Sequence, residues 1–210
     1  MDILELNKKA WENIGSRATP QRLEENKYKK MFELFCTKLP KNARVLDLGC
    51  GPGRIAKELT CWGFEVIGID LAGKMIKLAK KKAPKAKYLQ MSMTEIKFHD
   101  EFDGVVSSFS MLCLDPENFR KTAQKISRAL KKNGLFLLSL NEPHPEKSHN
   151  EEDNYTEIMG QKIYSRPYTE EEIKDIFSEY DVEIKCVKRE ILTSKEYGEE
   201  YTLIILMQKT

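Results

Sequence analysis

Apolar residues recur along this chain with two different periods, and the two alternate between about residue 44 and residue 140. Short, nearly continuous apolar runs are typical of strands buried on both faces, whereas apolar positions three and four apart are typical of amphipathic helices. The runs predict strands at 44–48, 64–70, 85–90, 102–109 and 135–140, and the stripes predict helices at 54–62, 73–82 and 115–132. This alternation favours right-handed crossovers, and therefore an α/β fold with a doubly wound parallel sheet and helices on both faces.

The two ends of the chain have different patterns. Residues 1–40 predict a helical cap, with an amphipathic piece before Gly15 and a second helix at 22–39. Residues 141–168 are rich in proline, histidine, tyrosine and acidic side chains, and we expect a long, irregular, lid-like insertion there.

A capping box at Thr169 starts a helix in the last segment, 169–210, and two apolar strands follow at 182–192 and 201–208. The turn between them, around Tyr197 and Gly198, predicts an antiparallel hairpin at the sheet edge. These patterns predict one domain over 1–210, with a core at 41–140 and a seven-stranded, mostly parallel sheet.

Composition narrows the protein class. The formal charge is +2, from 35 basic and 33 acidic residues, so nucleic acid is not favoured as a partner. The seven lysines between Lys74 and Lys87 are more typical of a solvated helix face than of an RNA site. Five scattered cysteines without a CxxC pair predict free thiols in a reducing compartment and no metal site. Residues 1–10 are charged and lack an apolar core, and no apolar run approaches about 20 residues, so we expect no secretory signal, no membrane spans and a cytoplasmic protein.

A glycine loop follows the first strand, with the sequence Asp47-Leu-Gly-Cys-Gly-Pro-Gly-Arg54. Asp70 ends the second strand, 21 positions after Gly49, where a carboxylate can accept hydrogen bonds from both hydroxyls of a ribose. A plain turn with a helix-capping Asp70 is the structural alternative. The dinucleotide fingerprint G-x-G-x-x-G is not matched because Arg54 replaces its third glycine, and Asp47 favours a ligand that carries positive charge.

These motifs resemble those of class I S-adenosylmethionine-dependent methyltransferases, small and of broad substrate range. The glycine loop resembles the first motif of that family, residues 68–76 the second, 102–108 its fourth strand and 130–134 the turn before its fifth. The resemblance implies a Rossmann-like sheet that ends in an antiparallel hairpin, and S-adenosylmethionine as the methyl donor, with S-adenosylhomocysteine as product.

The resemblance also implies roles by position. Asp47 would lie near the methionine ammonium of the ligand, Asp70 would bind the ribose, and Ser108 would lie beside the reacting centre. The remaining implied cofactor contacts are the loop residues Gly49, Cys50, Gly51 and Gly53, and the adenine-side residues Leu71, Met75, Ser92 and Met93. The family often has Asp at the position of Ser92, so the side-chain contact there differs.

Methyl transfer from a sulfonium is an in-line displacement, in which the protein mainly aligns the reactants and excludes water. A general base is needed only when the nucleophile is protonated. His144 and Tyr155, in the insertion, are the catalytic candidates, although a packing or solvated role is favoured for each.

The motifs described above identify a methyl donor, and the class of methyl acceptor must be inferred from other positions. Residues 107–110 read Ser-Ser-Phe-Ser and lack the Asn/Asp-Pro-Pro-aromatic motif of methyltransferases that act on nucleic-acid bases. We therefore expect a small-molecule acceptor and a monomer or homodimer. The alternatives are a non-catalytic S-adenosylmethionine-binding or partner protein, an RNA or protein methyltransferase, and, less favoured, a nicotinamide-dependent oxidoreductase.

Overall fold

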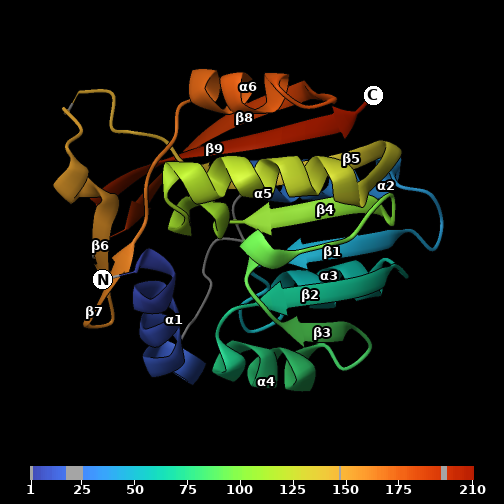
Figure 1. Ribbon diagram of the computed structural model, residues 1–210, viewed down its shortest axis with the longest axis horizontal. Helices are drawn as coiled ribbons and strands as arrows, with labels where there is room; N and C mark the ends of the chain where they lie inside the picture. Colours follow the sequence, from blue (N-terminus) through green and yellow to red (C-terminus); the bar gives the residue numbers. More distant parts are fainter. Residues whose placement is uncertain (1, 18–25, 147, 195–197) are drawn as a thin grey trace.

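The computed structural model describes residues 2–17, 26–146, 148–194 and 198–210. A seven-stranded sheet runs through it in the order β3-β2-β1-β4-β5-β9-β8, and β6 and β7 form a separate two-stranded sheet (Figure 1). The α-helices are α1 Ile3–Ile14, α2 Asn26–Lys38, α3 Arg54–Cys61, α4 Gly73–Lys82, α5 Pro116–Ala129 and α6 Glu170–Ser178. The strands are β1 Arg44–Leu48, β2 Glu65–Asp70, β3 Lys87–Gln90, β4 Phe102–Ser108, β5 Leu130–Asn141, β6 Tyr155–Ile158, β7 Gln161–Tyr164, β8 Val182–Ser194 and β9 Gly198–Lys209. Short 3₁₀ turns are η1 Gly15–Arg17, η3 Met93–Glu95, η4 Met111–Cys113 and η5 Glu151–Asn154.

The sheet confirms the predicted fold class. β1 pairs in parallel with both β2 and β4, and β4 pairs in parallel with β5, whereas β9 runs antiparallel between β5 and β8. The chain order reverses direction between β1 and β4, and in open α/β sheets ligands bind outside the carboxyl ends of the strands at this point. The hairpin of β8 and β9 is present as predicted, and its turn at 195–197 lies outside the described residues.

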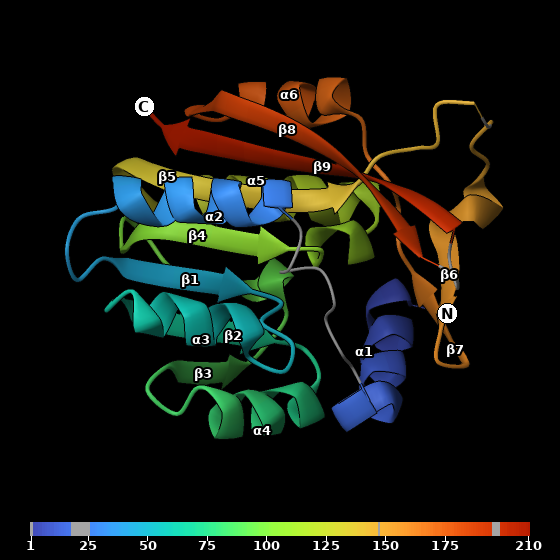
Figure 2. The same ribbon diagram turned by 180° about the vertical axis from the view of Figure 1, so that it is seen from behind.

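Helices cover both faces of the sheet. α5 and α6 lie on the face toward the viewer in Figure 1, and α2 and α3 lie on the other face, as Figure 2 shows. Two large apolar clusters fill these layers, one around Phe119 and Phe136 and one around Phe35 and Val45. The strands end on the side where α1 and the β6–β7 hairpin lie, so the fold places those two elements over the carboxyl ends of β1, β2 and β4 (Figure 1).

Side chains cap the N-termini of α5 and α6, and the capping box predicted at Thr169 is confirmed. Asp115 accepts a hydrogen bond from the backbone N–H of Asn118 through its side chain, with Pro116 at the first helical position of α5. Thr169 and Glu172 form the reciprocal capping box of α6. Both signals are local, because the side chain that caps a helix bonds to a backbone group two or three residues away.

The boundary between α5 and β5 differs from the prediction. The sequence predicts a helix up to Asn133 and a strand from 135, but α5 ends at Ala129 and β5 begins at Leu130. Leu130 pairs with Phe102 of β4, and Asn133 takes a left-handed conformation with φ +62°. Pairing with the neighbouring strand therefore outweighs the helical stripe over residues 130–133.

The insertion at 141–168 is more regular than predicted. β6 and β7 form a hairpin through Met159 and Gly160, whose φ angles of +52° and +73° match the tight turn that connects twisted strands. The prediction of an irregular segment was wrong here because the strands are short and the tight turn places Met159, a residue rarely found at positive φ, before the glycine. β7 packs against α1, which gives the hairpin a partner.

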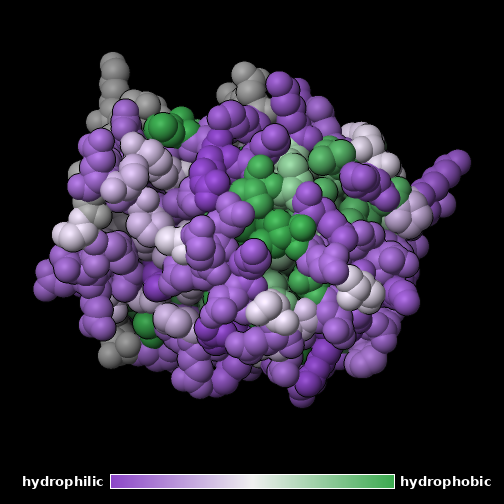
Figure 3. Space-filling view, turned by 90° about the horizontal axis from the view of Figure 1, so that it is seen from above, coloured by the Kyte–Doolittle hydropathy of each residue, from purple (hydrophilic) through white to green (hydrophobic). Residues whose placement is uncertain are grey.

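The strand β8 is one of the two edge strands of the large sheet, and β3 is the other. Seen from above, which is the side of β8 and α6, the molecule shows a group of hydrophobic residues within a mainly hydrophilic face (Figure 3). Ile191 of β8 is 56% exposed, and Lys185, Lys188 and Arg189 are charged neighbours on the same strand. Charged side chains on an edge strand disfavour pairing with another chain. None of the described helices is both long and apolar enough to span a membrane.

Candidate functional site

A cavity of about 730 Å³ lies at the carboxyl ends of β1, β2 and β4, beneath α1 and the insertion. The site residues suggested by the sequence that line it are Asp47, Gly49, Cys50, Gly51, Asp70, Leu71, Met75, Ser92, Met93, Ser108, His144 and Tyr155. Gly53 is the exception, because it does not line the cavity. The tertiary structure therefore brings together, around one cavity, residues that are separated by more than a hundred positions in the sequence.

The glycines of the loop have different surroundings. Gly51 has φ +49°, and a Cβ atom at this position would meet no atom within 4 Å, so the backbone faces the open cavity. Gly53 has φ +83°, and a Cβ atom would lie 2.7 Å from Cα of Ala79 in α4. Gly51 thus leaves room for a ligand, whereas Gly53 allows α3 and α4 to pack closely.

Asp70 joins the end of β2 to the glycine loop. Its carboxylate accepts hydrogen bonds from the backbone N–H groups of Gly51 at 2.9 Å and Ala72 at 2.8 Å. Burial raises the pKa of Asp70 to about 6 against the lowering effect of these two bonds, so the group is ionised at neutral pH. Each oxygen retains a lone pair after accepting one backbone hydrogen bond, which leaves room for two further donors.

Asp47 is the most unusual group in the cavity. Its side chain is 1% exposed, it accepts a hydrogen bond from the backbone N–H of Ala56, and its Oδ2 atom has no partner. Burial, and then the nearby charge of Asp70, raise the pKa of Asp47 to about 8. A buried carboxylate with an unpartnered oxygen is costly unless a cation or donor binds to it.

The loop after β3 forms another wall. Ser92 is buried and caps η3, because its Oγ accepts a hydrogen bond from the backbone N–H of Thr94. Its hydroxyl is also 2.7 Å from that of Thr94. Met93 lines the cavity beside it, and Leu71 and Met75 come from the segment after β2. These apolar side chains with one polar edge suit a flat aromatic group.

Asn7 holds α1 over the cavity, and it is a site residue that the sequence motifs do not identify. Its Nδ2 donates to the backbone oxygens of Cys113, at 2.9 Å, and Tyr164, at 3.0 Å, and its Oδ1 accepts from the N–H of Tyr164 at 2.8 Å. The sequence signal was a polar residue within the stripe of α1 that also contains Ala10 and Ile14. A buried asparagine in an apolar stripe needs partners from another element.

The far half of the cavity is lined by the insertion and by β9. His144 packs edge-to-face on Tyr201, with ring centres 4.9 Å apart, and its Nδ1 accepts the N–H of Glu146 at 3.2 Å. In the neutral ring this places the proton on Nε2, so His144 presents a donor. Tyr155 is 38% exposed, and the ammonium group of Lys162 lies 4.4 Å from its ring centre.

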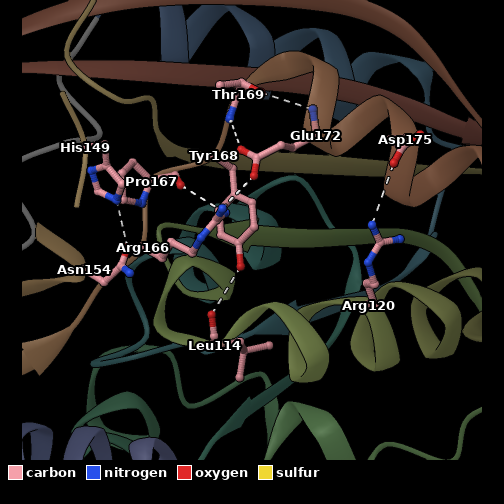
Figure 4. A network of polar contacts seen from close by, with 10 residues as sticks. All are labelled: Leu114, Arg120, His149, Asn154, Arg166, Pro167, Tyr168, Thr169, Glu172 and Asp175. Atoms are coloured by element: carbon pink, nitrogen blue, oxygen red, sulfur yellow. Dashed lines mark hydrogen bonds and ion pairs between the residues drawn. The ribbon is translucent and has the colours of Figure 1, made fainter. Parts of the chain in front are cut away.

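A polar network fixes the end of the insertion (Figure 4). The guanidinium of Arg166 donates to Glu172 at 2.6 Å and lies 4.3 Å from the ring centre of Tyr168. The hydroxyl of Tyr168 donates to the backbone oxygen of Leu114 at 3.3 Å. The network attaches the insertion to α6 and to the loop after β4.

The chemistry of the cysteines and acidic groups does not suggest a metal centre. Among the described residues, no group of three His, Cys, Asp or Glu side chains is arranged to hold a metal ion. Cys50 and Cys113 line the cavity as free thiols, and burial raises the pKa of Cys113 to about 12. A protonated thiol is a poor nucleophile and a poor metal ligand.

Comparison with known proteins agrees with this geometry. Residues 45–134 match the family model described as a methyltransferase domain. A methyltransferase-family relative, YqeM of Bacillus subtilis (strain 168), is 37% identical over 113 residues, which are 49% of this chain and 44% of the relative. The malonyl-[acyl-carrier protein] O-methyltransferase of Enterobacter lignolyticus is 28% identical over 64% of this chain and 54% of its own length. This chain spans about half the length of the curated relatives that it matches.

Solved structures share the fold. The 1,6-didemethyltoxoflavin-N1-methyltransferase of Burkholderia thailandensis, solved with 1,6-didemethyltoxoflavin and S-adenosylhomocysteine bound, has a TM-score of 0.73 at 18% identity, with 97% of this chain and 87% of that chain covered. A SAM-dependent methyltransferase from Methanosarcina mazei has a TM-score of 0.71 at 21% identity, covering 84% and 96%. The match of residues 45–134 covers the glycine loop, Asp70 and β4 together. Residues 45–134 are therefore similar to the methyltransferase domain, and the fold of the chain is that of solved S-adenosylmethionine-dependent methyltransferases.

Proposed function

We propose that this protein transfers a methyl group from S-adenosylmethionine to a small-molecule acceptor. The observation that carries the proposal is the pair of acidic side chains, Asp47 and Asp70, that line the cavity together with Gly51. Asp47 has a buried oxygen without a partner, and Asp70 is held by two backbone N–H groups with lone pairs to spare. A ligand with an ammonium group at one end and a ribose nearby satisfies both.

The residues fit the donor in the following way. Asp47 accepts from the methionine ammonium, and the Gly49–Gly51 backbone, with Cys50, lies against the methionine chain. Asp70 accepts from the ribose hydroxyls, and Leu71, Met75, Ser92 and Met93 enclose the adenine. Gly53 supports the loop from behind by its packing on Ala79 and makes no ligand contact. When bound, the donor would supply an activated methyl group on a sulfonium, whose methyl carbon can be attacked by a nucleophile of the acceptor while S-adenosylhomocysteine leaves as the neutral thioether.

The acceptor occupies the other half of the same cavity, between Ser108 and the insertion. A volume of about 730 Å³ is within the range of roughly 300–1,000 Å³ found for small-molecule sites. α1 and the 141–168 insertion act as a lid over a single domain, which excludes water from the reacting pair. The contribution of the protein is alignment, and the Nε2–H of His144 serves as a donor that orients the acceptor and not as a base.

Calorimetry with S-adenosylhomocysteine tests the donor site. The wild-type protein is expected to bind it in the micromolar range, and Asp70→Ala is expected to lose this binding. Asp175→Ala, an exposed carboxylate of α6, is the matched control and should bind like the wild type. Binding of NADH in place of S-adenosylhomocysteine would contradict the proposal.

Turnover tests the catalytic part separately. The formation of S-adenosylhomocysteine from S-adenosylmethionine is measured with a panel of small hydroxyl, amine, thiol and carboxylate compounds. Total RNA and protein are assayed separately as alternative acceptors. A signal from a small compound that disappears in Asp70→Ala supports the proposal. Tight donor binding without turnover on any acceptor favours a binding protein, and a signal confined to RNA or protein excludes a small-molecule acceptor.

A further inference from the structure

Several buried polar atoms of this protein lack a hydrogen-bond partner, and most of them lie on one face of the sheet. They are Tyr28 Oη, Asp47 Oδ2, Ser139 Oγ, Glu190 Oε2 and Thr202 Oγ1, together with Thr122 Oγ1 elsewhere. Tyr28, Asp47, Ser139 and Thr202 are each at most 1% exposed. Unpartnered buried groups are rare in folded proteins and often mark the binding of ordered water, an ion or a ligand.

The strand register places these groups in a continuous row. Asp47 of β1 is level with Val106 of β4, and Ser108, two residues further on, faces the same side. Ser108 is level with Ser139 of β5.

The row continues across the antiparallel strands. Asn141, two residues after Ser139, is level with Thr202 of β9, and Thr202 is level with Glu190 of β8. Paired residues and residues two apart point to the same face of a sheet, so the row crosses β1, β4, β5, β9 and β8 on one face.

The first turn of α2 covers the row. Ser108 lies beside the hydroxyl of Tyr28, and the backbone N–H of Lys27 donates to Glu190 Oε1 at 3.4 Å. Figure 2 shows α2 in front of β4 and β5, on this face of the sheet. Tyr28, Ser139, Glu190 and Thr202 do not line the large cavity. The row is therefore enclosed by protein and separate from the proposed donor and acceptor sites, except at Asp47, Ser108 and Asn141, which also line the cavity.

The hydrogen-bonding capacity and the spacing of the side chains in the row indicate which ligand they bind. The hydroxyls of Tyr28, Ser139 and Thr202 both donate and accept, and the carboxyl groups of Asp47 and Glu190 lie at the two ends, where a carboxylate accepts and a protonated carboxyl can also donate. Neighbouring positions on paired strands are about 5 Å apart, and diagonal neighbours are somewhat further. One water molecule with hydrogen bonds of about 2.8 Å on each side bridges such a gap.

We propose that these groups bind a chain of ordered water molecules that runs beneath α2 from Asp47 to Glu190. Each water molecule has two or more polar side chains as partners, as buried waters in proteins require. The chain supplies the partner that each side chain lacks, at Asp47 in the protein without bound donor, because the methionine ammonium contacts the same oxygen under the proposed function. It connects the carboxyl group in the cavity with a carboxyl group on the edge strand. The proposal is independent of methyl transfer.

Isosteric substitutions in the row test the proposal, because bound water predicts the direction in which the melting temperature changes. Removing the hydroxyl in Thr202→Val takes hydrogen bonds from bound water, so the melting temperature is expected to fall by about 2–4 °C. Thr122 is the matched control, because its buried hydroxyl also lacks a partner but lies on α5, on the opposite face of the sheet. Thr122→Val removes only an unsatisfied group, and its melting temperature is expected to stay unchanged or to rise. A rise in Thr202→Val equal to that in Thr122→Val would overturn the proposal.

A crystal structure of the wild-type protein at a resolution better than about 1.5 Å provides the second measurement, and it remains decisive if Thr202→Val does not fold. The expected result is at least two water molecules within hydrogen-bond distance of Tyr28, Ser139, Thr202 or Glu190. A dry row would refute the chain. So would a single site that gains anomalous signal when the crystals are soaked in rubidium chloride, because that result would identify a cation.

Discussion

The side chain of Asn7 pairs with the backbone of Tyr164 as a neighbouring strand would. Asn7 Oδ1 accepts from the N–H of Tyr164 at 2.8 Å, and Asn7 Nδ2 donates to the oxygen of the same residue at 3.0 Å. The carboxamide thus satisfies one residue of β7 on the side away from β6, and it holds α1 against the hairpin. The lid over the cavity therefore consists of two parts that are distant in sequence and joined by one buried side chain.

Replacement of this side chain should loosen the lid. Asn7→Leu removes three hydrogen bonds and leaves buried backbone groups unpaired, so the free energy of unfolding is expected to fall by about 2–4 kcal/mol. S-adenosylhomocysteine should dissociate faster, because α1 then closes the cavity less firmly. Urea unfolding and stopped-flow displacement measure the two effects. Asn13→Ala, at an exposed contact between α1 and Gln161, is the control, and an equal loss in both variants would contradict the role of Asn7.

The two glycines of the loop should respond differently to alanine. Gly51→Ala carries only the cost of a left-handed conformation, roughly 1–2 kcal/mol, but it places a methyl group in the cavity and should weaken S-adenosylhomocysteine binding at least tenfold. Gly53→Ala forces a Cβ atom to within 2.7 Å of the backbone of Ala79 and should destabilise the fold by more than about 2 kcal/mol. Calorimetry and thermal unfolding of both variants separate the two roles. Equal stability losses would show that the loop glycines are not divided in this way.

The buried carboxyl of Asp47 should make stability depend on pH. Its pKa is raised to about 8 in the folded protein, against about 3.9 in an unfolded chain. The folded state therefore binds more protons than the unfolded state between about pH 4 and pH 8, and stability falls as the pH rises through this window. Asp47→Asn stays neutral, so its advantage over the wild type should grow by up to about 1.4 kcal/mol per pH unit. Urea unfolding at pH 5, 6.5 and 8 measures this, and a constant difference would contradict the raised pKa.

Ligand binding should release the same proton. At pH 7 the Asp47 carboxyl is mostly protonated, because its pKa is about 8, but an ammonium group binds to the carboxylate. The affinity for S-adenosylhomocysteine is therefore expected to rise with pH by up to about tenfold per unit and to level off near pH 8. Calorimetry in buffers with different ionisation enthalpies counts the released protons. A flat pH profile would show that Asp47 is already ionised in the free protein.

The Arg166 network at the end of the insertion should contribute more to the free energy of unfolding than an ion pair on the surface. Arg166→Ala removes the bond to Glu172 and the contact with the ring of Tyr168, and we expect a loss of about 1–3 kcal/mol. Arg120 bonds to Glu179 and Asp175 with side chains that are 42–79% exposed, and Arg120→Ala should cost less than about 0.5 kcal/mol. Thermal unfolding compares the two variants, and similar losses would contradict this ranking.

Local sequence signals were sufficient where neighbouring residues decide the conformation. The Asp115 and Thr169 caps, the glycine loop after β1 and the positions of the strands of the large sheet along the chain follow from contacts within a few residues or from the apolar period. Local signals did not predict the boundary at Leu130 or the β6–β7 hairpin. The boundary depends on pairing with β4, and the hairpin depends on packing against α1. These tertiary contacts compete with local conformational preference, and their strength cannot be compared with it before the partner element is in place.

The sequence by itself determined the fold and the candidate donor site, because both are carried by short motifs placed on predictable strands. Only the tertiary structure decided which groups share the cavity, which glycine faces it and which buried atoms have no partner. Asn7 meets Tyr164 across 157 positions, and Ser139, Thr202 and Glu190 come together only through strand register. The strength of a polar contact depends on burial and geometry, which exist only after the chain has folded.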